Sequence, residues 1–468
     1  MSLSASPDLQ ASDWDRELIS KYDVAGPRYT SYPTALNFSE AFAANQYREQ
    51  AGKDQLTSIA PLSLYLHIPF CQNICYYCAC NKIVTKDKSV SRRYLDYLIK
   101  EITLQSALTN KRRLVTQLHL GGGTPTFMDN AELTELMHYL AHNFKLTDSP
   151  NREYSIEIDP RTVSPDTLAL LKGLGFNRLS LGVQDFDPQV QKAINRQQSV
   201  AMIKSLTQSA RLYQFKSVSY DLIYGLPFQT PESLLTTLQQ VIALAPDRIA
   251  FYNYAHLPER FSSQRTIDRL SLPSARQKLD MLELISNTLI EAGYLYIGMD
   301  HFVKPDDDLA IAQTKGKLQR NFQGYSTCMA PDLIGMGVSA ISSLEHCYAQ
   351  NEKKLEDYYR RLDNNELAVC KGLKLSQDDE LRRRVIHDII CNLELDPKKI
   401  EREFKCRFSE YFSQALQALI PLEIDGLIEW RDDKLRVTVR GRSMLRNICM
   451  PFDKYLSSSA SSSYSKAL

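Results

Sequence analysis

Short runs rich in β-branched and aromatic residues alternate with longer segments of helical periodicity from about residue 62 onwards. The segments 92–108 and 130–144 are two of the helical patterns. Alternation of this kind favours parallel strands with helices packed outside them. We therefore predict an α/β fold, an incomplete (β/α)6 barrel. Its six strands are expected at 63–68, 114–120, 154–158, 178–183, 217–223 and 248–254.

Other parts of the chain flank this predicted barrel. A helix is predicted at 275–293, and 294–302 has the pattern of a further strand. Beyond residue 370 the charged segments indicate helices followed by a small hairpin. The predicted boundaries are 1–60 for an N-terminal wrapping segment, 61–369 for the barrel, 370–455 for a smaller, mostly helical domain and 456–468 for a disordered Ser-rich tail.

Residues 21–35, KYDVAGPRYTSYPTA, are the most distinctive part of the N-terminal segment. Two prolines and a glycine argue against regular structure there. Surface wrapping is one interpretation of this segment, and the concentration of Tyr22, Arg28, Tyr29 and Tyr32 adds a lid or a substrate contact as the alternative.

Composition limits the class of partner. The 468 residues carry a formal net charge of +1, so no global field would attract nucleic acid, and a small-molecule substrate is expected. No run of eighteen apolar residues would span a membrane, and the polar N-terminus lacks the pattern of a signal peptide. We expect a cytosolic protein, and no coiled-coil or interface stripe argues against a monomer.

Polar and small residues follow each predicted strand. Carboxyl ends of parallel strands meet at one edge of a sheet, where ligands of such folds bind. A shared site is therefore predicted there. The residues are the cysteines after the first strand, Gly121–Pro125 after the second, Glu157 and Asp159, Gln184 and Asp185, Asp221 and Gly225, and Asn253, Ala255 and His256.

Four of the ten cysteines lie between positions 71 and 80. Cys71, Cys75 and Cys78 would place three thiolates on one short loop, which suits a corner of an iron–sulfur cluster, and Cys80 offers a fourth thiol. A structural zinc site and a buried loop without metal are the alternatives. The other cysteines are expected to be small buried residues: Cys328, Cys347, Cys370, Cys391, Cys406 and Cys449.

Other candidates have two interpretations each. Glycines at 121–123 would let a ligand approach the backbone, or form a flexible turn. Glu157 and Asp221 lie on apolar strands and need either a ligand's hydroxyl or ammonium group or a salt bridge. Arg196 could bind a carboxylate or lie on the surface, and Ile341 reads as core. The histidines His67, His119, His256 and His301 lack the spacing of a second metal site.

The CxxxCxxC spacing followed by GGGTP resembles the radical S-adenosylmethionine superfamily. Longer stretches resemble one family within it, the oxygen-independent coproporphyrinogen III oxidases, and the likeness covers nearly the whole chain. These stretches include KYDVAGPRYTSYPTA, SLYLHIPFCQNICYYCACNKIVT, LHLGGGTPT, SIEIDPR, GFNRLSLGVQDF, DLIYGLPFQTPES and RNICMPFD. Cys328–Pro331 departs from the more polar, glycine-containing residues expected there.

The resemblance implies a set of cofactor contacts. Cys71, Cys75 and Cys78 match the ligands of a 4Fe–4S cluster, whereas Cys80 matches a family cysteine that does not bind iron. The positions that match contacts to the cluster-bound S-adenosylmethionine are Tyr65, Gly122, Glu157 and Ile341. The positions that match a second S-adenosylmethionine are Tyr77, Gly123, Thr124, Gln184, Arg196, Asp221 and Ala255.

The resemblance also implies a reaction: conversion of two propionates of coproporphyrinogen III to vinyl groups through a 5′-deoxyadenosyl radical, giving protoporphyrinogen IX in haem biosynthesis. An electron donor and a terminal electron acceptor are required. Candidate cations for the tetra-anionic substrate are Arg28, Lys82, Lys304 and Arg320. The alternatives are a related haem chaperone, which would lack Cys80 and the 21–35 motif, and a zinc-stabilised binding protein without catalysis.

Overall fold

One thirteen-stranded sheet frames the molecule in the computed structural model, which describes residues 16–456. Six neighbouring strands run parallel, in the order β9-β8-β7-β6-β4-β1, which confirms the predicted alternation. The sheet path ends at β10 and β17, so the barrel stays open. The six strands are β1 Leu62–Ile68, β4 Leu114–Gly122, β6 Glu153–Ile158, β7 Arg178–Gln184, β8 Ser217–Tyr224 and β9 Arg248–Asn253.

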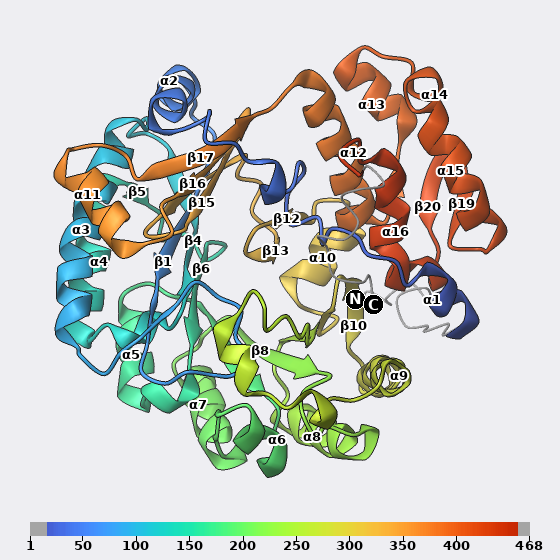
Figure 1. Ribbon diagram of the computed structural model, residues 1–468. Helices are drawn as coiled ribbons and strands as arrows, with labels where there is room; N and C mark the ends of the chain where they lie inside the picture. The colour runs from blue at the N-terminus through green and yellow to red at the C-terminus, as the bar shows by residue number, and fades with distance from the viewer. Residues whose placement is uncertain (1–15, 457–468) are drawn as a thin grey trace.

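Helices cover the outer face of these strands (Figure 1). Several begin with a side-chain cap: Asp129 accepts from the Glu132 amide and Ser164 from the Thr167 amide, which satisfies amides that the first helical turn leaves unpaired. The predicted helix at 275–293 is α9. The helices are α3 Ser89–Ala107, α4 Asn130–Asn143, α5 Pro165–Gly173, α6 Pro188–Ala193, α7 Val200–Leu212, α8 Pro231–Leu244 and α9 Ala275–Glu291.

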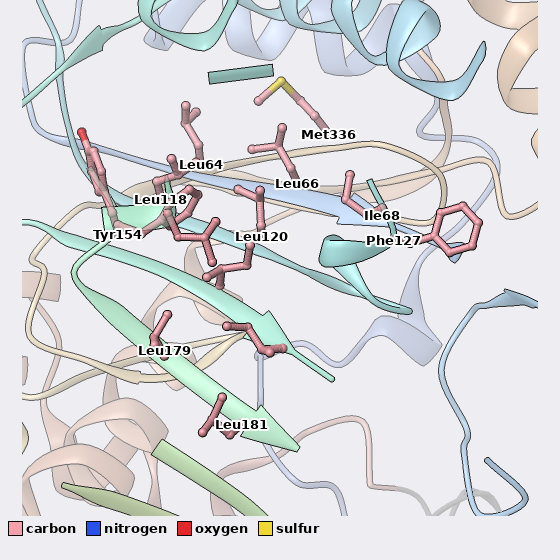
Figure 2. Packing of buried hydrophobic residues seen from close by; sticks show 14 of the residues in the cluster. Leu64, Leu66, Ile68, Leu118, Leu120, Phe127, Tyr154, Leu179, Leu181 and Met336 are labelled. Atoms are coloured by element: carbon pink, nitrogen blue, oxygen red, sulfur yellow. The ribbon is translucent and has the colours of Figure 1, made fainter. Parts of the chain in front are cut away.

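The main core lies between the sheet and these helices. Leu64, Leu66 and Ile68 of β1 pack beside Leu118 and Leu120 of β4 (Figure 2), and each of them is at most 1% exposed. Full burial of such a side chain contributes about 1.5–3 kcal/mol. The apolar runs on these strands therefore fix the sheet and present their polar carboxyl-terminal residues at one edge.

Both edges of the sheet carry additional strands. On one side β14 (Asp332–Met336) pairs parallel with β1 and leads to β15 (Ile341–Leu344), β16 (Cys347–Asn351) and β17 (Val369–Lys374). The sheet therefore continues to Lys374, beyond the predicted boundary at 369. The helix α11 (Leu355–Asp363) connects β16 to β17.

The other edge differs from the prediction of one strand at 294–302. β10 (Leu295–Gly298) and β11 (His301–Val303) form an antiparallel hairpin, and β11 pairs antiparallel with β9. The turn contains Met299 and Asp300, both with positive φ (46° and 73°). Gly298, just before them, also has positive φ (125°), but a methionine is an unusual residue for that conformation, so a turn was not predicted there. The helix α10 (Asp308–Thr314) and the hairpin β12 (Gln319–Asn321) to β13 (Gly324–Ser326) follow.

The C-terminal part is mostly helical with one small sheet, as predicted. A second hydrophobic cluster fills it and also contains Leu295, Ile297 and Val303 from the sheet edge, so it packs directly on β10 and β11. Its elements are α12 Gln377–Asn392, β18 Glu394–Leu395, α13 Pro397–Phe404, α14 Phe408–Tyr411, α15 Ser413–Ile424, β19 Ile428–Arg431, β20 Lys434–Val437 and α16 Leu445–Cys449.

The N-terminal segment runs from the C-terminal part to the sheet (Figure 1). It begins with α1 (Arg16–Tyr22) and ends with α2 (Ala44–Asp54). We call residues 23–39 between them the strap. The strap ends at a β-bridge between Ser39 and Gly372 of β17. Residues 1–15 of the predicted wrapping segment, and the predicted disorder of the tail at 457–468, lie outside the described residues.

The remaining short strands are β2 Phe70–Cys71, β3 Ile83–Val84 and β5 Lys145–Leu146. Across residues 16–456, no helix combines the length and apolar character that crossing a membrane requires.

Candidate functional site

Residues 71–80, which we call the cysteine loop, leave the carboxyl end of β1 and are fixed by hydrogen bonds from several elements. The Thr85 amide donates to the Cys71 carbonyl (2.9 Å), and the Tyr76 amide donates to the Ile194 carbonyl beyond α6 (3.0 Å). Ser263 donates to the Cys78 carbonyl (3.0 Å). The loop is thus held at both ends and in its centre before any ligand is bound.

Each of the three thiols meets a hydrogen-bond donor. Thr124 Oγ1 lies 3.5 Å from Cys71 Sγ, and Arg196 Nη1 lies 3.4 Å from Cys75 Sγ. A hydrogen bond from the Cys80 thiol lowers the pKa of Cys78, and the Lys82 ammonium lowers it further. Donors and positive charge favour the thiolate, which is the form that binds metal. Cys80 therefore acts as a hydrogen-bond donor that lowers the pKa of Cys78.

The loop fits an iron–sulfur cluster in its donor set: three cysteines on one segment, with donors aimed at their sulfurs. The zinc alternative requires a tighter arrangement, four ligands around one ion. In the part of the chain that the structure describes, no three His, Cys, Asp or Glu side chains converge on a position for a single metal ion.

Glu157 of β6 is the centre of a polar network beside the loop. Its carboxylate accepts from His119 Nε2 (3.2 Å) and from the Gly122 amide (3.1 Å). Burial would raise the pKa of Glu157, but the hydrogen bond and charge of His119 and the Gly122 amide hold it below its ordinary value. The Glu157 side chain is 42% exposed, so the ionised carboxylate faces the opening of the barrel.

Tyr65 and His67 of β1 extend this network. Tyr65 OH lies 3.0 Å from His67 Nδ1, and its ring stacks on His119 with centroids 5.8 Å apart. His67 Nε2 faces the Asn81 carbonyl at 3.0 Å, and burial lowers the pKa of His67, so the ring is neutral. His67 and His119 are therefore hydrogen-bonded structural residues, as predicted, but they also orient two candidate site residues, Tyr65 and Glu157.

The glycines at 121–123 are required by close packing. A Cβ on Gly121 would lie 2.7 Å from Glu157 Oε1, and one on Gly123 would lie 2.6 Å from the Pro69 carbonyl oxygen. Gly122 has φ of +122°, a conformation that side chains rarely adopt. The flexible-turn interpretation is thus wrong: the glycines let the end of β4 approach both Glu157 and the start of the cysteine loop.

Arg196 is buried, with its side chain 7% exposed, so the surface interpretation is wrong as well. Its guanidinium donates to Asp159 Oδ2 (3.1 Å), to the Gly182 carbonyl (2.8 Å) and to Cys75 Sγ. Arg161 adds a second bond to Asp159 (2.7 Å) and lies 3.6 Å from the same sulfur. Two arginines on one aspartate leave a net positive charge beside Cys75. Arg161 was missed because SIEIDPR shows no periodicity pointing it inward.

Asp221 of β8 carries a carboxylate with one side-chain donor, Ser180 Oγ at 2.6 Å. Burial raises the pKa of Asp221 to about 6. No salt bridge forms on it among the described residues, so the alternative of a structural ion pair finds no support. Gln184, at the end of β7, has φ of +65°, and its amide comes within 2.9 Å of where a Cβ of Gly182 would be. Gln184 therefore lies on the same side of β7 as Arg196, whose guanidinium comes within 2.8 Å of the same position.

Two adjoining cavities open at this edge. One, about 610 Å³, is lined by Tyr77, Cys78 and Cys80 of the cysteine loop and by Tyr252 and Ala255 at the end of β9. The second, about 530 Å³, extends toward α9 and the β10–β11 turn. The residues that line both are Arg28, Asn253, Tyr254, Ala255 and Leu257. A ligand can therefore reach from the thiols to the strap.

The remaining predicted residues are more scattered. Ile341 starts β15, and its backbone lies against Gly335, which pairs with Tyr65. Lys82 donates to the Cys78 carbonyl (3.0 Å). Lys304 does not join the site: it binds the Ala245 carbonyl (2.9 Å) and lies 3.4 Å from Asp247.

The scattered cysteines divide into two groups. Cys347, Cys391 and Cys449 are buried as predicted, whereas three others are only half-buried: Cys328, Cys370 and Cys406. The loop at Cys328–Pro331 leads from β13 into β14, and the Cys328 thiol lies 3.5 Å from the Thr116 carbonyl oxygen. Nothing in these contacts explains the departure of this loop from the expected residues.

Known proteins resemble this chain in both sequence and structure. The Radical SAM superfamily matches residues 65–241, and the HemN C-terminal domain matches residues 375–444. The oxygen-independent coproporphyrinogen III oxidase of Pseudomonas aeruginosa is 50% identical over 96% of this chain and 98% of its own; that of Escherichia coli is 49% identical over 96% and 97%. The solved Escherichia coli structure, described as coproporphyrinogen III oxidase (HemN), a radical SAM enzyme, superposes with a TM-score of 0.90 over 95% of this chain and 100% of that one.

Proposed function

We propose that this chain, which belongs to the family of oxygen-independent coproporphyrinogen III oxidases, converts coproporphyrinogen III to protoporphyrinogen IX without oxygen. The observation that carries the proposal is the cysteine loop at the mouth of two joined cavities, with a thiol at one end and arginine at the other. Relatives named as oxidases over the whole chain favour this activity over a haem chaperone.

The family uses a 4Fe–4S cluster and S-adenosylmethionine. Cys71, Cys75 and Cys78 would hold the cluster: a donor faces the sulfurs of Cys71 and Cys75, and hydrogen bonding from Cys80 lowers the pKa of Cys78, whereas burial raises the pKa of Cys71 to about 11. When bound, the cluster and S-adenosylmethionine supply a 5′-deoxyadenosyl radical that takes a hydrogen atom from the substrate. The protein's part is to bind, orient and keep water out.

We assign the cluster-bound S-adenosylmethionine to the Glu157 side of the opening. Glu157 is ionised and faces the opening, so it can accept from an ammonium group, and the Gly122 amide donates to it. Tyr65 and Ile341 are assigned to the same molecule. A second S-adenosylmethionine would lie toward Asp221. The residues assigned to it are Tyr77, Gly123, Thr124, Gln184, Arg196, Asp221 and Ala255. Arg196 can contact a ligand only by sharing a guanidinium that already binds Asp159.

Each round of the reaction turns one propionate into a vinyl group. The hydrogen atom leaves the β-carbon, the carbon–carboxylate bond breaks, carbon dioxide departs, and one further electron passes to an external acceptor. A separate donor must reduce the cluster. We propose a monomeric enzyme in the cytosol, where thiols stay reduced.

The strap gives this reaction a cover. Arg28 on the strap lines both cavities, so the strap closes one side of the space between the thiols and α9. Exclusion of water protects a reactive intermediate from side reactions. Deletion of residues 1–35 should therefore abolish coupled turnover while S-adenosylmethionine is still cleaved. Unchanged turnover with coupled cleavage would refute a role for the strap.

The central test is an anaerobic assay with reductant, S-adenosylmethionine and coproporphyrinogen III. We expect protoporphyrinogen IX and 5′-deoxyadenosine to form together. Haem binding by the purified protein without any decarboxylation would instead support the chaperone. A colourless protein that contains zinc would contradict the cluster.

A further inference from the structure

Lys278 on α9 is a half-buried cation that its surroundings leave without a counter-charge. Its Nζ donates to the Tyr254 carbonyl (2.9 Å) and lies 3.4 Å from Asn253 Oδ1, at the end of β9. Burial lowers the pKa of Lys278, and no carboxylate of residues 16–456 counters that shift. An ammonium group that is withdrawn from water is normally paired with an anion, because its desolvation costs free energy. Lys278 is therefore suited to a negatively charged ligand.

The end of β8 leaves room for this ammonium group. Gly225 directly follows β8 with a φ of +84°, a conformation that side chains rarely adopt. A Cβ at this position would lie 2.7 Å from Lys278 Cε and 3.1 Å from its Nζ. The glycine therefore lets the ammonium group lie against the ends of two neighbouring strands, β8 and β9.

Lys278 lines the cavity of about 530 Å³, at the start of the wall that α9 forms. The rest of this wall is mostly apolar and consists of Leu279, Leu282, Ile285, Ser286 and Ile290. The acids that line the cavity, Asp23 and Asp300, belong to the strap and to the β10–β11 turn. Among the described residues that line it, none belongs to the cysteine loop, which lines the adjoining cavity. Lys278 thus serves the part of the joined space that the thiols do not line.

Other cations near this space have different surroundings. Arg28 lines both cavities, and its Nη1 lies 3.6 Å from Asp300 Oδ2. Arg446 donates to two carbonyls of the strap. Arg320, a predicted substrate cation, lines a separate cavity on the strap and neither of these two. Lys278 differs from all three, since it lines the cavity beside α9 and its partners among residues 16–456 are neutral oxygens of β9 and the residue after it.

We propose that Lys278 binds a propionate that the reaction retains. The inference rests on the proposed function. Two of the four propionates lose carbon dioxide, each beside the cysteine loop in its turn, and the other two remain in the product. Only a retained propionate can lie away from the thiols in both rounds. A carboxylate paired with Lys278 would therefore hold the substrate by a group that never reacts, and would set which propionates reach the radical.

Binding of coproporphyrin III, the stable oxidised form of the substrate, tests this assignment in cluster-loaded enzyme with S-adenosylmethionine and no reductant. Lys278→Gln keeps a donor for the Tyr254 carbonyl but removes the charge. It should raise the Kd about 10–100-fold, as expected for losing a hydrogen bond between charged groups. Lys278→Arg keeps the charge and should fall between Lys278→Gln and the wild type. Arg276→Gln, at an exposed position of α9 that does not line the cavity, should bind like the wild type. Iron content equal to that of the wild type checks that each variant is folded.

Protoporphyrin IX, which has only the two retained propionates, separates this role from two others. If the proposal holds, Lys278→Gln weakens its binding by a similar factor. Weaker binding of coproporphyrin III alone would mean that Lys278 holds a reacting propionate and would overturn the proposal. Wild-type affinity of Lys278→Gln for both porphyrins would make Lys278 a structural link between α9 and β9 and would also overturn it. A wild-type enzyme that neither binds coproporphyrin III nor decarboxylates its reduced form would instead refute the proposed function.

Discussion

The cysteine loop and the strap border the same opening, yet they are built in different ways. The loop is held at four of its carbonyls, those of Cys71, Ile74, Tyr77 and Cys78, by donors on separate segments: the Thr85 amide and the side chains of Asn195, Gln264 and Ser263. The strap is held chiefly from one region, the C-terminal part. Arg446 donates to the Pro27 carbonyl, and Tyr29 donates to Asp453.

The difference follows from what each segment must hold. A loop that positions three sulfurs needs a defined backbone, and hydrogen bonds to four of its carbonyls provide it. A segment that covers a large substrate has to be released for binding and product exit. Contacts made by a few side chains to one surface can open together without disturbing the sheet. We therefore propose that the cysteine loop is preorganised and that the strap opens.

Removing a thiol from the cysteine loop should have the largest effect and tests the difference between the loop and the strap most directly. Cys75→Ala should abolish cluster loading, so coupled turnover should drop by at least about 1,000-fold, because the chemistry depends on the cofactor. Iron content and 5′-deoxyadenosine formation measure the effect. Cys370→Ala, on β17, is the matched control and should keep its iron. A Cys75→Ala protein with a full complement of iron would contradict the assigned ligands.

A substitution that releases the strap should have a different effect from the loss of a thiol. Arg446→Met removes the hydrogen bonds to the Gly26 and Pro27 carbonyls, each worth about 1.5–3 kcal/mol because the donor is charged. We expect faster proteolysis within residues 23–39 and a loss of turnover of about 10–100-fold, with iron content unchanged. Burial, and then the charge of Arg28, lowers the pKa of Arg446 to about 10. Removal of Arg446 relieves this repulsion with Arg28, which partly offsets the loss.

Arg436→Met, on the exposed hairpin of the C-terminal part, serves as the control for Arg446→Met. Its guanidinium is bound to Glu394, away from the strap. Equal proteolysis of both variants would show that the strap is not held by Arg446.

A smaller effect is expected when the pH is changed, on the affinity for S-adenosylmethionine at Asp221 of the barrel. Burial raises the pKa of Asp221 to about 6, so the carboxyl is mostly protonated at pH 5 and mostly ionised at pH 7. If Asp221 accepts hydrogen bonds from a ribose, affinity for S-adenosylmethionine should rise about tenfold from pH 5 to pH 7 and then level off. Asp221→Asn should remove this dependence. Identical pH profiles for the two proteins would contradict the assignment.

The smallest effect is expected inside the loop itself. Cys80 donates to Cys78 and is not assigned as a ligand, so Cys80→Ser, which keeps a donor, should retain all cluster iron. Turnover should change by less than about threefold, within the range of a conservative substitution outside the ligand set. Loss of iron from this variant would make Cys80 a ligand and would place four cluster ligands on the loop.

Periodicity was sufficient to predict the six parallel strands, because each carries an apolar run that only burial explains. It failed where conformation depends on a few residues: Gly298, Met299 and Asp300 all have positive φ at the turn between β10 and β11, and only the first is a residue that favours it. It also failed at β17, whose sequence VCKGLK lacks an apolar run, because pairing with β16 holds this strand in the sheet.

The candidate site also contains residues that could be predicted from the sequence and residues that could not. Cys71, Cys75 and Cys78 are close in sequence, so spacing alone indicated a shared ligand. Arg161 contacts Asp159, and His119 contacts Glu157 of the neighbouring strand. No local sequence pattern reveals either contact. Lys304 shows the opposite error, since nearness to a motif along the chain did not bring it to the site.

The strap has a further consequence for how the enzyme is made. A ribosome releases residues 23–39 long before residues 446–454, to which they bind, because synthesis proceeds from the N-terminus. The barrel can form in that interval while its mouth has no cover. Iron and sulfide can then be delivered to the three thiols directly, and docking of the strap onto the finished C-terminal part becomes the last step in maturation of the enzyme.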